Sequence, residues 1–88
     1  MKIKDGFILR EIAGSFVVVP VGQNLVDFSS MITLNETAAF LWNCLSEGAS
    51  EEELCEKLLS EYEGVTKEDA LADIKEIVKI LEEKNILE

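Results

Sequence analysis

The 88-residue sequence predicts an α+β fold built like a winged helix, with a small three-stranded antiparallel sheet followed by a three-helix unit. Short β-branched and aromatic runs fill the first third of the chain, and apolar residues then recur with a helical period. The charge changes in the same region, because residues 1–46 carry a net charge of −1 and residues 47–88 carry −9. We expect one domain over residues 1–88, with a strand half (1–34) and a helical half (35–88).

Three segments of the first half have the composition of strands. Residues 7–12 and 16–19 are the first two, and the glycine-containing turn signal Ala13-Gly14-Ser15 between them predicts a tight hairpin. We expect Pro20 to end the second strand, because proline cannot donate to a ladder. Residues 31–34 form the third candidate, which is short and predicted to lie at an edge of the sheet.

The second half contains the start and stop signals of three helices. Asn35 is a favourable N-cap for the first helix, which we expect to stop at Gly48. Ser50 opens the second helix with the capping-box pattern S-x-x-E, and Gly64 is expected to end it. Thr66 opens the third helix, which is predicted to reach Lys84-Asn85, with Asn85 in the left-handed conformation.

One isoleucine of the third helix lies off its apolar stripe. At about 100° per residue, Ile80 falls about 80° from Ala70, whereas Ile74, Ile77 and Leu81 cluster near it. Ile80 either marks the edge of the core or lines a groove for a partner. A short edge strand beside such a groove would offer unpaired N–H and C=O groups to an extended peptide.

The composition excludes several kinds of active site. The chain has no His, which rules out a Ser-His-Asp triad, a Cys-His pair and a His-ligated metal. Cys44 and Cys55 fit no metal or redox spacing and are predicted to be reduced core thiols. We therefore expect no enzyme, no catalytic residue, no metal and no cofactor. The absence of a secretory signal or apolar span predicts a cytoplasmic protein that binds no membrane.

The centre of the chain resembles a known family. Residues 34–39, Leu-Asn-Glu-Thr-Ala-Ala, followed by Leu41-Trp42, are similar to the "LN-x-(T/S)-A…(I/L)-W" signature of PqqD-like proteins. Similar spacing continues along essentially the whole chain, although Asn85 stands where the family usually has Gly. Further matches are Arg10 to Gly14, Val19 to Gly22, Glu61-Tyr62, Asp73-Ile74, Ile77, Leu81 and Ile86-Leu87.

The resemblance implies a recognition element for ribosomally made, post-translationally modified peptides, in PQQ biosynthesis or a similar pathway. Such domains bind the leader of a precursor peptide and present it to a modifying enzyme, often a radical SAM maturase. The leader adds as an antiparallel strand to the third strand and lies against the third helix. The peptide-binding residues this implies here are Met31, Ile32, Thr33, Leu34, Asp73, Ile77, Ile80 and Lys84.

Two aspects of this site stay open at the level of sequence. The opposite flank of the third helix, with Lys75, Val78 and Lys79, competes with the flank that carries Asp73 and Lys84. The protein is expected to be a monomer or a weak or swapped dimer, because a free edge strand invites self-pairing. The glutamate clusters are either a solvated face or a docking surface for a basic patch of the enzyme.

Three other functions are weaker alternatives. A winged-helix DNA-binding regulator needs a basic recognition helix, but this chain has a pI of about 4.3 and an acidic third helix. An acyl-carrier-like protein needs Ser directly after Asp, and Phe28 separates Asp27 from Ser29. An enzyme with paired carboxylates lacks any specific constellation. Nucleic acid is therefore not expected as a partner.

Overall fold

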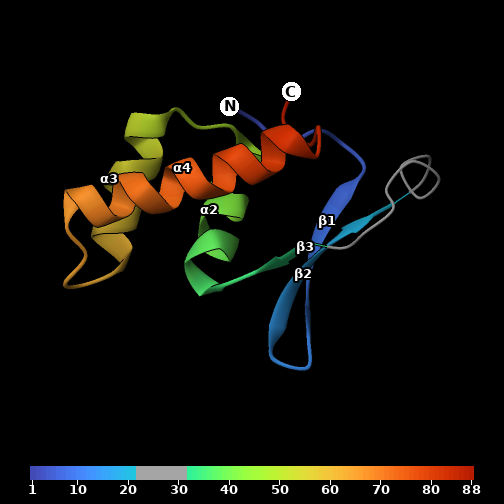
Figure 1. The fold of residues 1–88 in the computed structure, drawn as a ribbon, viewed down its shortest axis with the longest axis horizontal. Helices are drawn as coiled ribbons and strands as arrows, with labels where there is room; N and C mark the ends of the chain where they lie inside the picture. The colour runs from blue at the N-terminus through green and yellow to red at the C-terminus, as the bar shows by residue number, and fades with distance from the viewer. Residues whose placement is uncertain (22–31) are drawn as a thin grey trace.

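A computed structural model describes residues 1–21 and 32–88, and Figure 1 shows a sheet hairpin projecting from a group of three helices. The α+β fold predicted from the sequence is confirmed. Met31 and the segment with Asp27, Phe28 and Ser29 lie outside the described residues. The elements in chain order are β1 (Phe7–Ile12), β2 (Ser15–Pro20), β3 (Ile32–Leu34), α2 (Glu36–Glu47), α3 (Glu51–Glu61) and α4 (Lys67–Glu83).

The β1–β2 hairpin turns on two residues. Ala13 and Gly14 both have positive φ, 51° and 83°, as a type I′ turn requires. Ile12 pairs with Ser15 directly on either side of them. The turn is therefore one residue shorter than the sequence suggested, because Ser15 already belongs to β2.

Strand β2 ends at Pro20, as predicted, and Pro20 is itself the last paired residue of the strand. The Val21 N–H donates to the Gly6 carbonyl at 2.8 Å, which makes this a hydrogen-bonded pair. Pairs of the two kinds alternate along an antiparallel ladder, so the next pair, Phe7–Pro20, is a non-hydrogen-bonded one. Proline at that position removes no hydrogen bond from the β1–β2 ladder.

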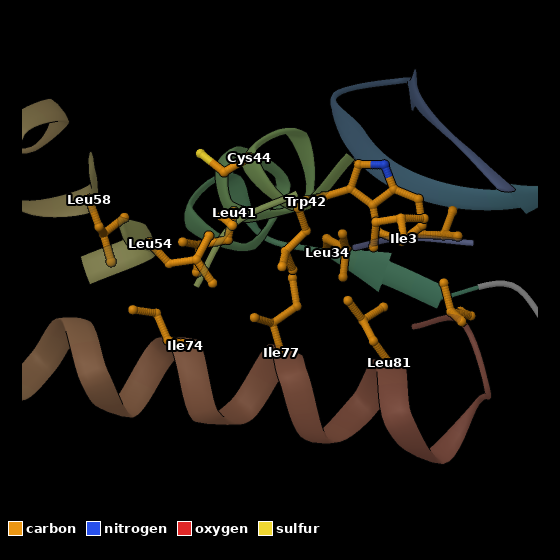
Figure 2. Packing of buried hydrophobic residues seen from close by; sticks show 14 of the residues in the cluster. Ile3, Leu34, Leu41, Trp42, Cys44, Leu54, Leu58, Ile74, Ile77 and Leu81 are labelled. Atoms are coloured by element: carbon orange, nitrogen blue, oxygen red, sulfur yellow. The ribbon is translucent and has the colours of Figure 1, made fainter. Parts of the chain in front are cut away.

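The core lies between one face of the sheet and the three helices. Figure 2 shows the side chains of Ile74, Ile77 and Leu81 on α4 pointing toward residues of α2 and α3. Trp42 is only 2% exposed and is therefore a core residue. Buried residues of the cluster include Ile3, Val18, Ile32, Leu34, Leu41, Leu45, Leu54, Leu58, Ala70 and Ile86. Cys44 and Cys55 are buried and free, as expected.

The predicted helix starts are confirmed. The Ser50 hydroxyl accepts a hydrogen bond from the Glu53 N–H, and the Glu53 carboxylate accepts one from the Ser50 N–H, each at 3.1 Å. The Thr66 hydroxyl accepts from the Asp69 N–H at 3.1 Å. Helix α3 stops at Glu61, three residues earlier than the sequence suggested. No helix of the described ranges is long and apolar enough to cross a membrane.

The two ends of the chain are joined by backbone hydrogen bonds. Buried Ile3 forms a bridge with Leu87 and donates its N–H to the Leu45 carbonyl at 3.1 Å. The Lys4 N–H donates to the Ile86 carbonyl at 2.8 Å. The N-terminal segment therefore holds the C-terminal tail against the end of α2, and both termini lie on the same side of the molecule in Figure 1.

Asn85 reverses the chain after α4, as predicted. Its φ of 58° is left-handed, its N–H donates to the Glu82 carbonyl, and the Ile86 N–H donates to the Leu81 carbonyl. These two bonds form a Schellman motif, in which the apolar residues at both ends of the longer bond pack together. The Lys4 ammonium also donates to the Asn85 side-chain oxygen at 2.8 Å.

We predict that the substitution Ile3→Ala lowers the free energy of unfolding by about 2–4 kcal/mol, because it leaves a cavity in the core. Ile12→Ala removes the same atoms from a side chain that is 51% exposed, and should cost less than about 1 kcal/mol. Urea unfolding followed by the fluorescence of the single Trp measures both. Equal losses for the two variants would contradict the packing of the N-terminal segment.

The capping box of α3 predicts a pH effect. Hydrogen bonds from Ser50 lower the pKa of Glu53 below its ordinary value of 4.5. This stabilisation is complete above the ordinary pKa and is lost as the pH falls through the lower pKa of the folded protein. Below about pH 5, the urea midpoint of Glu53→Gln should therefore fall less steeply than that of the wild type. Glu52→Gln is the charge-matched control, and identical slopes for wild type and Glu53→Gln would refute the effect.

Candidate functional site

A groove of about 80 Å³ runs between the end of the sheet and the last helix. We call it the β3–α4 groove. The end of β3 and the first turn of α2 form one wall, and one flank of α4 forms the other. Its lining residues are Thr33, Leu34, Asn35, Thr37, Ala38, Asp73, Glu76, Ile77 and Ile80.

Strand β3 has one unpaired edge among the described residues, because the sheet order is β1-β2-β3. The alternation set by the Gly6–Val21 pair directs the backbone groups of Phe16 and Val18 away from β1 and toward β3. Their partners are Leu34 and Ile32, whose backbone groups therefore point back to β2. The N–H and C=O of Thr33, between them, point to the open edge.

The side chains of Ile32 and Leu34 in β3 point into the core, whereas the backbone of Thr33 faces the open edge. Ile32 and Leu34 are 8% and 5% exposed, so their side chains belong to the core. Thr33 is exposed. Of the four predicted strand positions, Ile32 and Leu34 thus anchor the strand, and Thr33 offers its peptide group. Met31 lies outside the described residues.

The structure brings three of the four predicted α4 residues to the groove. Asp73 is exposed, Ile80 is half-buried, and Ile77 is only 2% exposed and forms part of the floor. Lys84 is exposed at the C-cap of α4, one turn beyond Ile80, and does not line the groove.

The competing flank of α4 faces elsewhere. Lys75, Val78 and Lys79 line a separate hollow of about 320 Å³ together with Met1 and Glu51. The helix thus presents Asp73 and Ile80 to the groove, and Lys75 and Lys79 to the other side.

Two parts of the groove were not predicted from the sequence, namely the first turn of α2 and the carboxylate of Glu76. The Asn35 side chain caps α2 by accepting the Ala38 N–H at 2.8 Å, and this places the start of α2 directly at the groove. Glu76 lines the groove beside Asp73. Its position three residues after Asp73 was a usable signal, since residues at i and i+3 share a helix flank.

The titratable groups with raised pKa values lie away from the groove. Burial raises the pKa of the Cys44 thiol, which keeps it protonated and a poor nucleophile at neutral pH. Desolvation likewise raises the pKa of Tyr62, whose ring meets that of Phe40 edge-on at 5.7 Å. In the part of the chain that the structure describes, no group of three or more His, Cys, Asp or Glu residues is placed to hold a metal ion.

Two solved structures share this architecture. One is TbiB1 in complex with the TbiA(beta) leader peptide, with a TM-score of 0.75 and 25% identity over 100% of this chain and 95% of that chain. The other is lasso peptide synthetase B1 complexed with the leader peptide, with a TM-score of 0.71 and 27% identity over 97% and 93% of the two chains. No curated protein matches the sequence.

The family comparison covers most of the fold just described. Residues 16–87 match the family of coenzyme PQQ synthesis protein D (PqqD). The match extends from the start of β2, through the groove, to the tail that pairs with Ile3. The chain belongs to the PqqD family.

Proposed function

We propose that the protein binds the leader segment of a ribosomally synthesised precursor peptide by strand addition and presents it to a modifying enzyme. The observation that carries the proposal is the outward-facing peptide group of Thr33 at the wall of the β3–α4 groove. Family membership and the two structural neighbours, both solved with leader peptides, support it.

Strand addition explains why the site has few specific side chains. A peptide extended along β3, about 4.8 Å away, pairs with the backbone of Thr33, and main-chain hydrogen bonds give the affinity. Alternate side chains of this peptide point toward α4, where half-buried Ile80 provides an apolar surface. The strand and helix are held by the core before the peptide arrives, which limits the entropy lost on binding.

The chemistry belongs to a partner in this proposal. The groove is lined by two threonines, an asparagine, two carboxylates and aliphatic side chains, and the buried Cys44 thiol lies elsewhere. We extend the proposal to a separate modifying enzyme, a radical SAM maturase, as the family resemblance implies. We also propose that the protein without peptide is a monomer or a weak or swapped dimer, since the edge of β3 is then open to a second copy.

DNA binding has less support, although the fold is winged-helix-like. Helix α4 carries three lysines and six acidic residues, so its field repels phosphate. The acyl-carrier alternative rests on Asp27 and Ser29, which lie outside the described residues. Neither alternative uses the open edge of β3.

We predict that Thr33→Pro weakens leader binding more than about tenfold, because it removes the outward N–H and places a ring on the open edge. The fold should survive, with a loss below about 1.5 kcal/mol, since this N–H takes no part in the β2–β3 ladder. Calorimetry with a synthetic leader peptide measures the affinity. Thr33→Val keeps the amide and is the matched control. If Thr33→Pro bound the leader with unchanged affinity, the strand-addition mechanism would be contradicted.

Two substitutions that each introduce a carboxylate test which flank of α4 contacts the peptide. Ile80→Asp should weaken binding of the same leader by about tenfold or more, because it puts a desolvated carboxylate against apolar peptide side chains. Val78→Asp makes a similar change at a half-buried position on the opposite flank, and should leave the affinity within about twofold. Both variants should give the circular dichroism of the wild type. A larger loss for Val78→Asp would place the peptide on the other flank.

A further inference from the structure

The β3–α4 groove is chemically different at its two ends. Asp73 and Glu76 are both exposed and line the α4 wall. Because β3 and α4 run in roughly opposite directions (Figures 1 and 2), these carboxylates lie toward the first turn of α2, which follows β3. Ile80 also lines the α4 wall, one turn farther along the helix than Glu76. A peptide lying in the groove therefore meets carboxylates at one end and an aliphatic side chain at the other.

No positive charge balances these carboxylates within the groove. Among the described residues that line it there is no Lys or Arg, and Lys84 lies outside it. The sequence of residues 22–31 contains no Lys, Arg or His either. The acidic end therefore favours a cationic side chain on the ligand.

We propose that the protein selects leader segments in which a Lys or Arg precedes a large apolar residue by two positions. This inference rests on the proposed function, because it assumes that an extended peptide occupies the groove. It assigns Asp73 and Glu76 to the cationic side chain and Ile80 to the apolar one.

The spacing follows from helix and strand geometry. Glu76 and Ile80 are four residues apart, or about 6 Å along the axis of α4. Side chains at i and i+2 of an extended strand point the same way and lie about 6.7 Å apart. Asp73, one turn before Glu76, adds a second carboxylate within reach of a long cationic side chain.

The order follows from the chain directions. Figures 1 and 2 both show β3 and α4 running in roughly opposite directions. A peptide that pairs antiparallel with β3, the more stable ladder, thus runs in the same direction as α4. It passes Glu76 before it reaches Ile80, so the cationic residue comes first.

The test is a selection from a phage-displayed library of random 15-residue peptides. The intact wild-type protein should enrich peptides with Lys or Arg two positions before Ile, Leu, Val or Phe. The double variant D73K/E76K should enrich Asp or Glu at that position and keep the apolar preference. Both substituted residues are exposed, so the circular dichroism and thermal unfolding of this variant should match the wild type.

A quantitative arm uses one peptide selected on the wild type. The near-isosteric double variant D73N/E76Q should bind it about three- to tenfold more weakly and with a smaller salt dependence. E82Q/E83Q removes two charges on the other side of α4 and should leave the affinity unchanged.

The outcomes separate this inference from the proposed function. The selected peptides could lose binding to Thr33→Pro but show no charge preference on the wild type or on D73K/E76K. That result would overturn the inference and leave the proposed peptide binding intact. An apolar residue placed before the cationic one would overturn the antiparallel placement. If no selected peptide lost binding to Thr33→Pro, strand addition would fail, and the inference with it.

Discussion

The burial of the apolar stripe of α4 is the constraint on which the rest of the molecule depends. Ala70, Ile74, Ile77 and Leu81 are each 2% exposed or less. Packing them against α2, α3 and the sheet fixes the rotation of α4 about its own axis. Because residues at i, i+3 and i+4 share a flank, this rotation also decides which polar residues face β3. The α4 wall of the β3–α4 groove is thus determined by packing in the core.

The same packing holds β3, whose second edge is unpaired among residues 1–21 and 32–88. Ile32 and Leu34 place their side chains in the core and their backbone groups toward β2, so the strand is held although it is only three residues long. Helix α2 begins immediately after it, capped by Asn35. An unpaired edge is usually an aggregation hazard, and natural proteins limit it with short strands and nearby charges. The brevity of β3 and the carboxylates of Asp73 and Glu76 meet both conditions.

Much of this was accessible from the sequence, for identifiable physical reasons. Caps such as Ser50 and Thr66, and the left-handed Asn85, depend on interactions within a few residues, so local patterns predicted them. The pairing of Pro20 with Phe7 was not predictable, because it depends on the phase of the ladder, which the Gly6–Val21 hydrogen bond sets. To know which flank of α4 faces β3, the tertiary packing was also needed. Periodicity places Ile80 and Val78 on opposite sides of the stripe, but it does not say which side meets the strand.

Helix α4 contributes both a buried residue to the floor of the β3–α4 groove and exposed residues to its rim. Substitutions at these two kinds of position should have different effects. Ile77 is both core and groove floor, so a substitution there would alter stability and binding together. Asp73 and Glu76 are exposed on the rim, where substitutions usually change the free energy of unfolding by less than about 0.5 kcal/mol. In the proposed binding mode, backbone pairing at Thr33 does not depend on the side chains of either strand. If the peptide binds as proposed, charge selectivity would rest on exposed residues whose substitution costs the fold little. The main-chain hydrogen bonds at Thr33 would be lost only on substitution by proline.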